Sequence, residues 1–332
     1  MNEGKYFSYC LISRRSRHRA GARYHSRGVD MDGNVSNYVE TEQIIWTSTG
    51  QVSSFVQVRG SIPVLWKQVV KVQYKPNLVI SGGDSTLEAF TKHFDDQISI
   101  YGDQIVVNLI NQHGYEKPLS IAFAKLVEWK KDGRIRYIHF DFHQECSRMR
   151  WDRISVLIDA ISGDLDSQGY FLKNGAGFGN QGSLVQRRQS SVVRTNCIDC
   201  LDRTNVVQSV IAKQKLVQQL QELGIITNNV SFPFLDHMFQ NVWADNADAI
   251  SMQYSGTGAL KTDYTRTGKR SKSGIVSDLM KSILRYVKNH YLDGFKQDAF
   301  DLFTGEYVVS KSNGEMFASD AISIDIIIVN HI

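Results

Sequence analysis

Residues 192–205 read Val-Val-Arg-Thr-Asn-Cys-Ile-Asp-Cys-Leu-Asp-Arg-Thr-Asn, and this stretch decides the fold because an apolar strand passes through a short loop into a helix. Cys197 opens the loop and Arg203 closes it. Inward backbone N–H groups and the positive end of the following helix make such a loop a phosphate site. The same field favours thiolate over thiol, which predicts a lowered pKa and a nucleophilic role for Cys197.

Arg203 suits this site because a planar guanidinium can hold two phosphate oxygens at once, which the point charge of a lysine cannot do. The reaction implied is an attack of the Cys197 thiolate on phosphorus, with a covalent phosphocysteine intermediate. We expect no metal ion or other cofactor in this chemistry.

Cys197 and Cys200 also form a Cys-x-x-Cys pair, a spacing found in zinc and redox sites. Zinc needs four ligands, and the other two cysteines, Cys10 and Cys146, are isolated in the sequence. A redox pair would leave the acidic residues and the arginine of the loop unexplained. We expect Cys200 either to pack beneath the loop or to trap an oxidised Cys197 as a reversible disulfide.

The stretch from Arg194 to Asn205 reproduces the signature Arg-x-Asn-Cys-x-Asp-Cys-Leu-Asp-Arg-Thr-Asn and resembles the SAC-domain (suppressor-of-actin) phosphoinositide phosphatases. The resemblance extends over roughly residues 5–308. Further blocks that resemble the family are residues 14–21, 55–63, 140–143 and 256–262.

The resemblance implies an enzyme that hydrolyses phosphatidylinositol monophosphates, chiefly phosphatidylinositol 4-phosphate. The most similar members act at the cytosolic face of endoplasmic reticulum and Golgi membranes. Two alternatives remain. One is a protein tyrosine or dual-specificity phosphatase, which shares the Cys and Arg spacing but usually has a loop richer in glycine. The other is a catalytically silent module that only binds the phosphoinositide headgroup.

A general acid is expected because the inositol hydroxyl is a poor leaving group. We favour Asp199, whose pKa should be raised by repulsion from the phosphate. Asp202 is the second candidate, and its structural alternative is to cap the helix or orient Arg203. Thr204 is expected to cap the helix or donate a hydrogen bond to the thiolate. The residues expected to bind substrate are Asn196, Ile198, Cys200, Leu201, Thr204, Lys261, Lys269 and Arg270.

Asp141 and His143 are expected to contact the residues of the loop rather than the substrate, since they would point to one side of an alternating strand. The alternative is that His143 is a buried, hydrogen-bonded structural residue.

The chain has a net charge of +4, and basic residues are concentrated in segments 14–27 and 261–272. The first segment holds six arginines and no acid, so we expect both segments to form a basic rim facing anionic lipid. The alternative is a pair of solvated loops. Nucleic acid is not expected as a partner, because the clusters lack interleaved base-stacking aromatics.

The alternation of strands, helices and loops predicts an α/β fold with a mixed sheet flanked by helices, and the Cys-x5-Arg loop between a strand and a helix. A capping box at Ser85 and Glu88 predicts a helix start, and residues 162–191 are expected to be irregular. The expected strands are 5–12, two within 35–58 around a turn at 48–50, a buried one at 78–80, 105–110, 135–142 and 192–193. The expected helices are 85–98, 119–130, 151–161, 206–220, 234–248 and 274–291.

Residues 1–309 are expected to be a SAC catalytic lobe truncated at its N-terminus, and 310–332 a divergent tail. Family members have an extra N-terminal lobe, and those resident in organelles have a C-terminal anchor. The missing lobe or a tethering protein is therefore an expected partner. No transmembrane segment is expected, because the apolar stretch 322–332 is about half of the ~20 residues that a spanning helix needs.

Overall fold

The computed structural model describes residues 6–69, 77–147, 150–175, 184–227, 233–306 and 326–331. Within these residues the main sheet has nine strands, in the order β11-β1-β2-β3-β10-β6-β7, with β8 paired to β3 and β9 to β8. Its strands are β1 (Phe7–Arg15), β2 (Val39–Thr47), β3 (Val52–Arg59), β6 (Asp103–Asn108), β7 (Ile135–His139), β8 (Phe171–Lys173), β9 (Val185–Arg187), β10 (Ser191–Asn196) and β11 (Ile326–His331).

The sheet is mixed, as predicted. β11, β1, β2 and β3 pair antiparallel, whereas β3, β10, β6 and β7 run parallel to one another. β10 lies in the middle of the parallel half, and all six of its residues are buried. The carboxyl ends of these parallel strands meet at one edge of the sheet, where open α/β sheets place their ligand sites.

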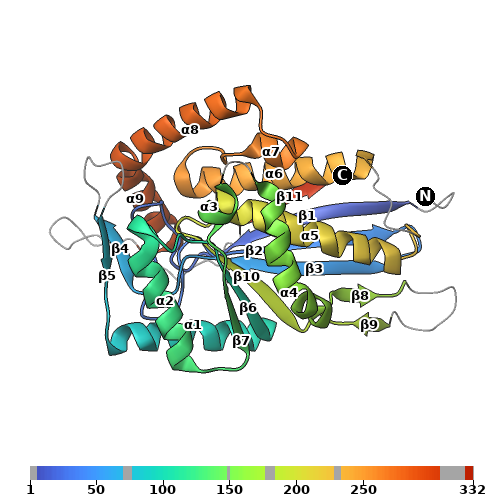
Figure 1. Cartoon of the computed structure of the whole chain (residues 1–332), viewed down its shortest axis with the longest axis horizontal. Coiled ribbons are helices and arrows are strands. Elements are labelled where there is room, and N and C mark those ends of the chain that lie inside the picture. Colours follow the sequence, from blue (N-terminus) through green and yellow to red (C-terminus); the bar gives the residue numbers. More distant parts are fainter. Residues whose placement is uncertain are drawn as a thin grey trace.

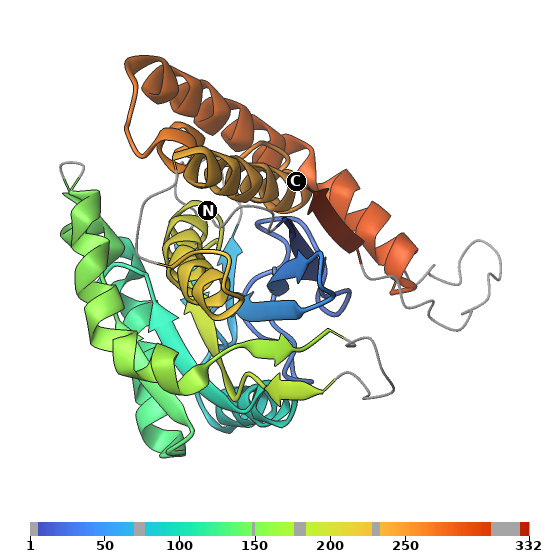
Figure 2. The same cartoon turned by 90° about the vertical axis from the view of Figure 1, so that its right-hand side faces the viewer.

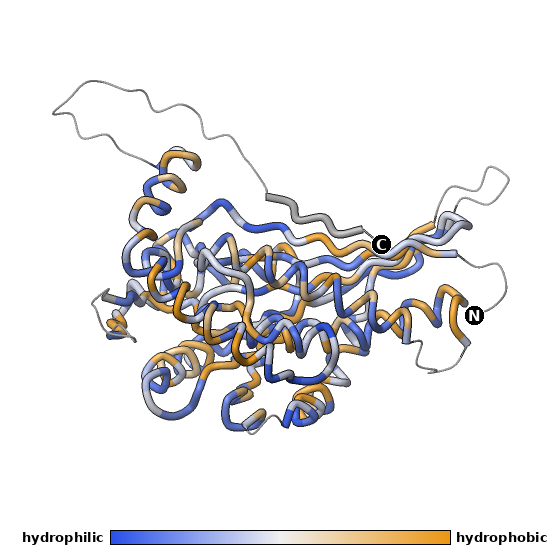
Figure 3. Tube along the Cα trace, turned by 90° about the horizontal axis from the view of Figure 1, so that it is seen from above, coloured by the Kyte–Doolittle hydropathy of each residue, from blue (hydrophilic) through white to orange (hydrophobic). Residues whose placement is uncertain are grey.

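Helices cover both faces of the sheet (Figure 1 and Figure 2). α5 packs on β3 and β10 and α6 on β1 and β11, while α1 and α2 pack on β6 and β7. The hydropathy colours alternate along the helices (Figure 3), as amphipathic helices require. The helices are α1 (Asp84–Tyr101), α2 (Lys117–Lys130), α3 (Phe142–Glu145), α4 (Ile154–Gln168), α5 (Asp202–Glu222), α6 (Pro233–Ser255), α7 (Thr262–Thr267), α8 (Lys272–Tyr291) and α9 (Asp293–Thr304).

Many predicted elements are confirmed, namely the hairpin with a turn at residues 48–50, the buried strand near 105–110 and the helices predicted over 119–130 and 206–220, which begin at Lys117 and Asp202. The capping box is wrong. α1 is preceded by Gly83 with φ 90°, and its first turn has no side-chain cap. The predicted buried strand at 78–80 is part of β5 (Asn77–Ile80). Among the described strands β5 pairs with β4 (Trp66–Val69) alone, and Val79 is 40% exposed.

The supposed irregular region contains the end of α4 and the two strands β8 and β9, while residues 176–183 lie outside the described residues. Of the predicted tail, the structure describes only 326–331, which form an edge strand antiparallel to β1. In the described part of the chain, no helix combines the length and the apolar character needed to cross a bilayer.

Candidate active site

The segment between β10 and α5 forms a loop at the carboxyl edge of the parallel strands, with Cys197 directly after β10 and Arg203 in the first turn of α5. The loop that follows β6 lies beside it, because the Leu109 N–H donates to the Asn196 carbonyl at 2.8 Å. The predicted order of strand, loop and helix is therefore present, and a second loop borders it.

Asn196 and Cys200 hold the loop from below rather than facing an open site. The Asn196 amide donates to the Gly60 carbonyl at 2.9 Å, and the Cys200 thiol donates to the same carbonyl at 2.9 Å. The Cys197 N–H in turn donates to the Cys200 sulfur at 3.2 Å. Cys200 adopts φ 52° and is 1% exposed. Of the two expectations for Cys200, packing beneath the loop is the one seen.

Cys197 is buried, and burial raises the pKa of its thiol. The charge of Arg203 acts in the opposite direction, whereas Glu116 and Asp199 add to the increase. The predicted lowering of the pKa is therefore wrong for this structure. The sequence motif indicated that the thiol lies at the positive N-terminal end of α5. It did not indicate that the thiol is buried away from water or that the carboxylates of Glu116 and Asp199 lie nearby.

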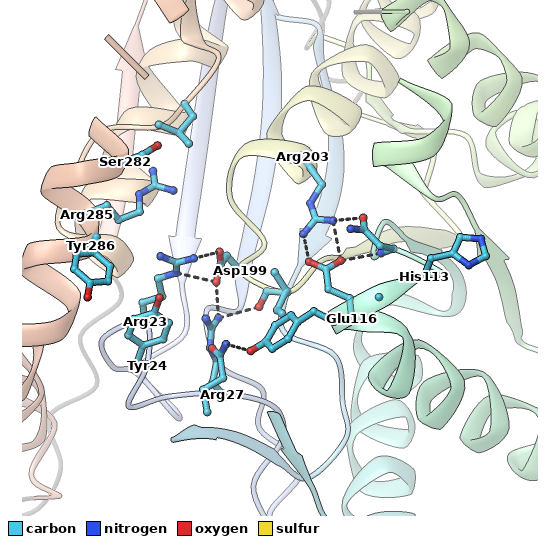
Figure 4. A pocket seen from close by; sticks show the side chains of 16 residues that line it. Arg23, Tyr24, Arg27, His113, Glu116, Asp199, Arg203, Ser282, Arg285 and Tyr286 are labelled. Atoms are coloured by element: carbon cyan, nitrogen blue, oxygen red, sulfur yellow. Dashed lines mark hydrogen bonds and ion pairs between the residues drawn. The ribbon is translucent and has the colours of Figure 1, made fainter. Parts of the chain in front are cut away.

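The Arg203 guanidinium binds Glu116 with two parallel hydrogen bonds of 3.0 and 2.9 Å (Figure 4). It also donates to the Leu109 carbonyl and to the Asn111 side chain, each at 3.2 Å. Glu116 and Asn111 were missed by the sequence analysis. Their position after the buried strand β6, at the same edge as the loop after β10, is the signal that could have found them.

Asp199 lies between Arg23 and Arg27, each with a nitrogen 2.7 Å from a carboxylate oxygen (Figure 4). These charges outweigh burial and hold the pKa of Asp199 well below its usual range. The expectation of a raised pKa is therefore not met in this structure, and an ionised carboxylate is unsuited to donate a proton.

The arginines of segment 14–27 do not form the expected free basic face. Besides the two that bind Asp199, Arg14 pairs with Glu40 and Glu42. Arg15 is 4% exposed, so it is a buried residue of β1. The prediction assumed that a segment without acids has no acidic partner, but the partners come from distant parts of the chain.

We expect Asp199→Asn to lower the free energy of unfolding by about 3 kcal/mol at neutral pH, because it leaves two largely buried arginines without their counter-ion. The pKa of Asp199 is depressed, so its contribution is present above the unfolded-state value of ~3.9 and is lost as the pH falls below it. Urea unfolding should show this pH dependence. Glu88→Gln, which removes an exposed pair with Lys92, is the control and should have little effect. An equal effect of both substitutions would contradict the assignment of Asp199 as the counter-ion of Arg23 and Arg27.

Asp202 neither caps α5 nor contacts Arg203, in contrast to its structural alternative. Its carboxylate accepts the Leu260 N–H at 2.6 Å and pairs with Arg285 at 3.1 Å. The helix has no side-chain cap at Leu201. Asp202 therefore connects the loop between β10 and α5 to the segment that precedes α7 and to α8.

Two adjoining cavities open at the loop. The first, which we call the nucleophile cavity, measures about 510 Å³ and is lined by Cys197, Asp199, Leu201, Asp202, Arg203, Lys261, His143 and Trp151, among others. The second, the arginine cavity, measures about 380 Å³ and is lined by Arg23, Arg27, Ile198, Asp199, Arg203, Ser282, Arg285 and Tyr286, among others. Arg203 and Asp199 belong to both walls, so the two cavities meet at the loop.

Lys261 is the basic residue of segment 261–272 that reaches the nucleophile cavity. Its ammonium lies 5.4 Å from the centre of the Phe142 ring and 5.2 Å from that of Trp151, and burial lowers its pKa. Lys269 and Arg270, also predicted to bind substrate, line neither cavity. Lys269 is exposed, and Arg270 pairs with Asp263 and Asp278. These two predictions are not met.

The remaining predicted residues take varied places. The Thr204 hydroxyl is buried and has no hydrogen-bond partner among the described residues. Asp141 caps α3 through the Gln144 N–H and also accepts the Gln112 N–H at 2.8 Å, so it joins two loops of the site. His143 is exposed and lies in α3, because β7 ends at His139, so the predicted shared strand face is wrong.

No group of three or more His, Cys, Asp or Glu side chains within the described ranges is placed to hold a metal ion.

Comparison with known proteins places these features in a family. Residues 1–147 match the model of the SacI homology domain. The chain is 49% identical over 316 residues to "Phosphatidylinositol-3-phosphatase SAC1-B" of Danio rerio, covering 93% of this chain and 52% of that protein. It is 47% identical over 307 residues to "Phosphatidylinositol-3-phosphatase SAC1" of Saccharomyces cerevisiae (90% and 49%), and 43% over 308 residues to "Phosphoinositide phosphatase SAC7" of Arabidopsis thaliana (91% and 50%). The chain spans about half the length of these relatives.

Proposed function

This chain belongs to the family of SAC-domain phosphoinositide phosphatases, and from that premise we propose that it removes the phosphate of phosphatidylinositol monophosphates through a phosphocysteine on Cys197. The observation that carries the proposal is the position of Cys197 and Arg203 at the two ends of one loop, in the wall of the nucleophile cavity. The substrate class is supported by the names of the relatives.

In the proposed reaction the Cys197 sulfur attacks phosphorus in line with the inositol oxygen, and the P–O bond breaks as the S–P bond forms. Arg203 would exchange its two bonds to Glu116 for two phosphate oxygens, with the same fork geometry. Water then attacks the phosphocysteine and releases inorganic phosphate. The Cys197 thiol must lose its proton before the attack, and the positive charge of Arg203 favours that loss.

The leaving oxygen also needs a proton, and we assign this step to Lys261. Asp199 is held ionised by two arginines, and both oxygens of Asp202 already accept hydrogen bonds. The Lys261 ammonium lines the same cavity as Cys197, and its lowered pKa eases the release of a proton.

We expect Lys261→Arg, which keeps the charge but cannot release a proton, to reduce lipid hydrolysis by about 10²-fold. An aryl phosphate should be hydrolysed almost normally, because its phenolate leaves without a proton. The comparison of kcat on the two substrates is the measurement, and Lys269→Arg, on an exposed residue outside both cavities, is the control. An equal loss on both substrates would assign Lys261 to binding instead.

The substrate is tested by phosphate release from vesicles that contain phosphatidylinositol 3-, 4- or 5-phosphate, against release from a phosphotyrosine peptide. We expect turnover of the lipids, chiefly the 4-phosphate, and none of the peptide. Peptide turnover would support a protein phosphatase, and binding without turnover would support a silent headgroup-binding module. The proposed location is the cytosolic face of endoplasmic reticulum and Golgi membranes.

A further inference from the structure

α8 is an amphipathic helix whose polar side faces the protein. Arg285 is 5% exposed and donates to Asp202, Thr257 and the Gly258 carbonyl. One turn further on, the Asn289 amide donates to the Ser255 carbonyl at 3.0 Å. Polar contacts of this kind, rather than apolar packing, attach the inner side of α8 to α6 and to the catalytic loop.

α8 lies at the top of the molecule in Figure 1, and its side opposite Arg285 and Asn289 is apolar and exposed. We call it the outer face of α8. It carries Val276, Leu279, Met280, Ile283, Leu284 and Val287, which are 43–63% exposed. Six neighbouring apolar side chains of this exposure are unusual on a protein surface and mark a site of contact with another apolar phase.

The charges of α8 indicate which phase that is. Asp278 is the only acidic residue between Lys272 and Tyr291, and it is turned inward, where it pairs with Arg270 and accepts the Lys261 N–H. The outer face therefore carries no negative charge, and exposed Lys272 lies at its N-terminal end. Apolar side chains bordered by positive charge are typical of helices that lie in the interface of anionic membranes.

The position of α8 connects this face to the site. Ser282 and Tyr286, on the flank of the same helix, line the arginine cavity together with Arg203. Since a helix is about 10 Å in diameter, a surface that touches the outer face lies one helix width from the cavity wall. The acyl chains of a phosphoinositide remain in the bilayer while its headgroup projects from the surface. An enzyme that acts on the headgroup therefore needs its cavity within about this distance of the bilayer surface.

We propose that the outer face of α8 docks on a lipid bilayer, with its apolar side chains inserted among the headgroups, and so positions the cavities over the substrate. This inference rests on the proposed function. It also replaces the predicted role of segment 14–27, because Arg14, Arg23 and Arg27 are engaged in ion pairs with Glu40, Glu42 and Asp199.

The test uses the full chain and cosedimentation with vesicles of phosphatidylcholine and phosphatidylserine. We expect the double substitution Leu279→Glu and Ile283→Glu to weaken binding at least about tenfold, because carboxylates resist insertion into an apolar layer. The matched control is Ile121→Glu with Val156→Glu, which places the same charge on exposed apolar residues of α2 and α4. The control should bind as the wild type does, and equal binding by the α8 variant would overturn the proposal.

Hydrolysis of a soluble short-chain phosphatidylinositol 4-phosphate separates docking from catalysis. We expect both double variants to hydrolyse it at the wild-type rate, while the α8 variant loses activity on vesicles. The vesicle-binding measurement therefore tests whether α8 docks on the bilayer. Hydrolysis of the short-chain lipid by the wild type separately tests whether the chain is a phosphoinositide phosphatase.

A second measurement does not depend on the folding of the double variant. Met280→Cys, made in the Cys197→Ser background so that the nucleophile is not alkylated, can be labelled with an environment-sensitive fluorophore, because the three remaining native cysteines are buried. Its emission should rise on addition of vesicles, and should do so even in molar salt, where charges are screened beyond ~3 Å. An unchanged emission would overturn the proposal. The proposal would also be overturned if the wild type formed a dimer that the α8 double variant could not form, while that variant still bound vesicles. The outer face of α8 would then bind a second copy of the chain.

Discussion

Replacing Cys197 by serine is expected to reduce phosphoinositide hydrolysis by at least about 10⁴-fold while substrate binding is retained. A serine hydroxyl at this position keeps the shape of the side chain but is not a nucleophile at neutral pH. The other thiol of the loop, Cys200, is 1% exposed and donates to the Gly60 carbonyl beneath the loop, so it is not placed to replace Cys197. The measurement is the initial rate of phosphate release from phosphatidylinositol 4-phosphate, together with the affinity for the same lipid.

Cys146→Ser is the matched control, because Cys146 is also buried and lines the nucleophile cavity but lies outside the loop. It should leave most activity intact. Since burial raises the pKa of Cys197, inactivation of the free enzyme by iodoacetamide should accelerate as the pH rises above neutral. More than about a tenth of wild-type activity in Cys197→Ser would remove the phosphocysteine mechanism, because loss of a covalent nucleophile normally costs orders of magnitude.

Arg203→Lys should lower kcat by about 10²–10³-fold although the positive charge is kept. An ammonium can pair with Glu116 but cannot offer two parallel N–H groups to the oxygens of a transferring phosphoryl group. The effect should fall mainly on kcat and less on KM, because the fork matters most in the transition state.

Arg153→Lys provides the control for the change of side chain. Arg153 forms an ion pair with Glu145 and is 41% exposed, outside both cavities. Its substitution should leave kcat within about twofold of wild type. A similar rate in Arg203→Lys would show that charge alone is needed at position 203.

The loop between β10 and α5 could be predicted from the sequence because its determinants are local. An apolar strand, a six-residue spacing and a following helix place Cys197 and Arg203 together in any fold that forms these elements. The mixed sheet and most helix positions followed from periodicity in the same way. Local signals failed where two of them competed, as at α1, where Gly83 rather than a capping box precedes the helix.

The electrostatics of the loop could not be predicted, because its partners are distant in the sequence. Asp199 binds Arg23, which lies 176 positions earlier, and Arg203 binds Glu116, 87 positions earlier. The same distances explain why segment 14–27 was misread as a free basic face. Burial of Cys197 depends on packing that the motif alone does not contain.

The amphipathic pattern of α8 shows a second limit. Periodicity identifies two sides of a helix, but it does not state which side faces the protein. The usual assumption places the apolar side inward, whereas Arg285 and Asn289 occupy the inner side here and Leu279 and Met280 are more than half exposed.

The measurement that tests the central claim most directly is the capture of the intermediate. The enzyme is mixed with phosphatidylinositol 4-phosphate, quenched within one turnover, digested and analysed by mass spectrometry under conditions that preserve thiophosphate esters. We expect a phosphate on Cys197 in the wild type, absent in Cys197→Ser and present in Cys146→Ser. Phosphate on another residue, or continued turnover of wild type without any phosphorylated peptide, would contradict the phosphocysteine mechanism.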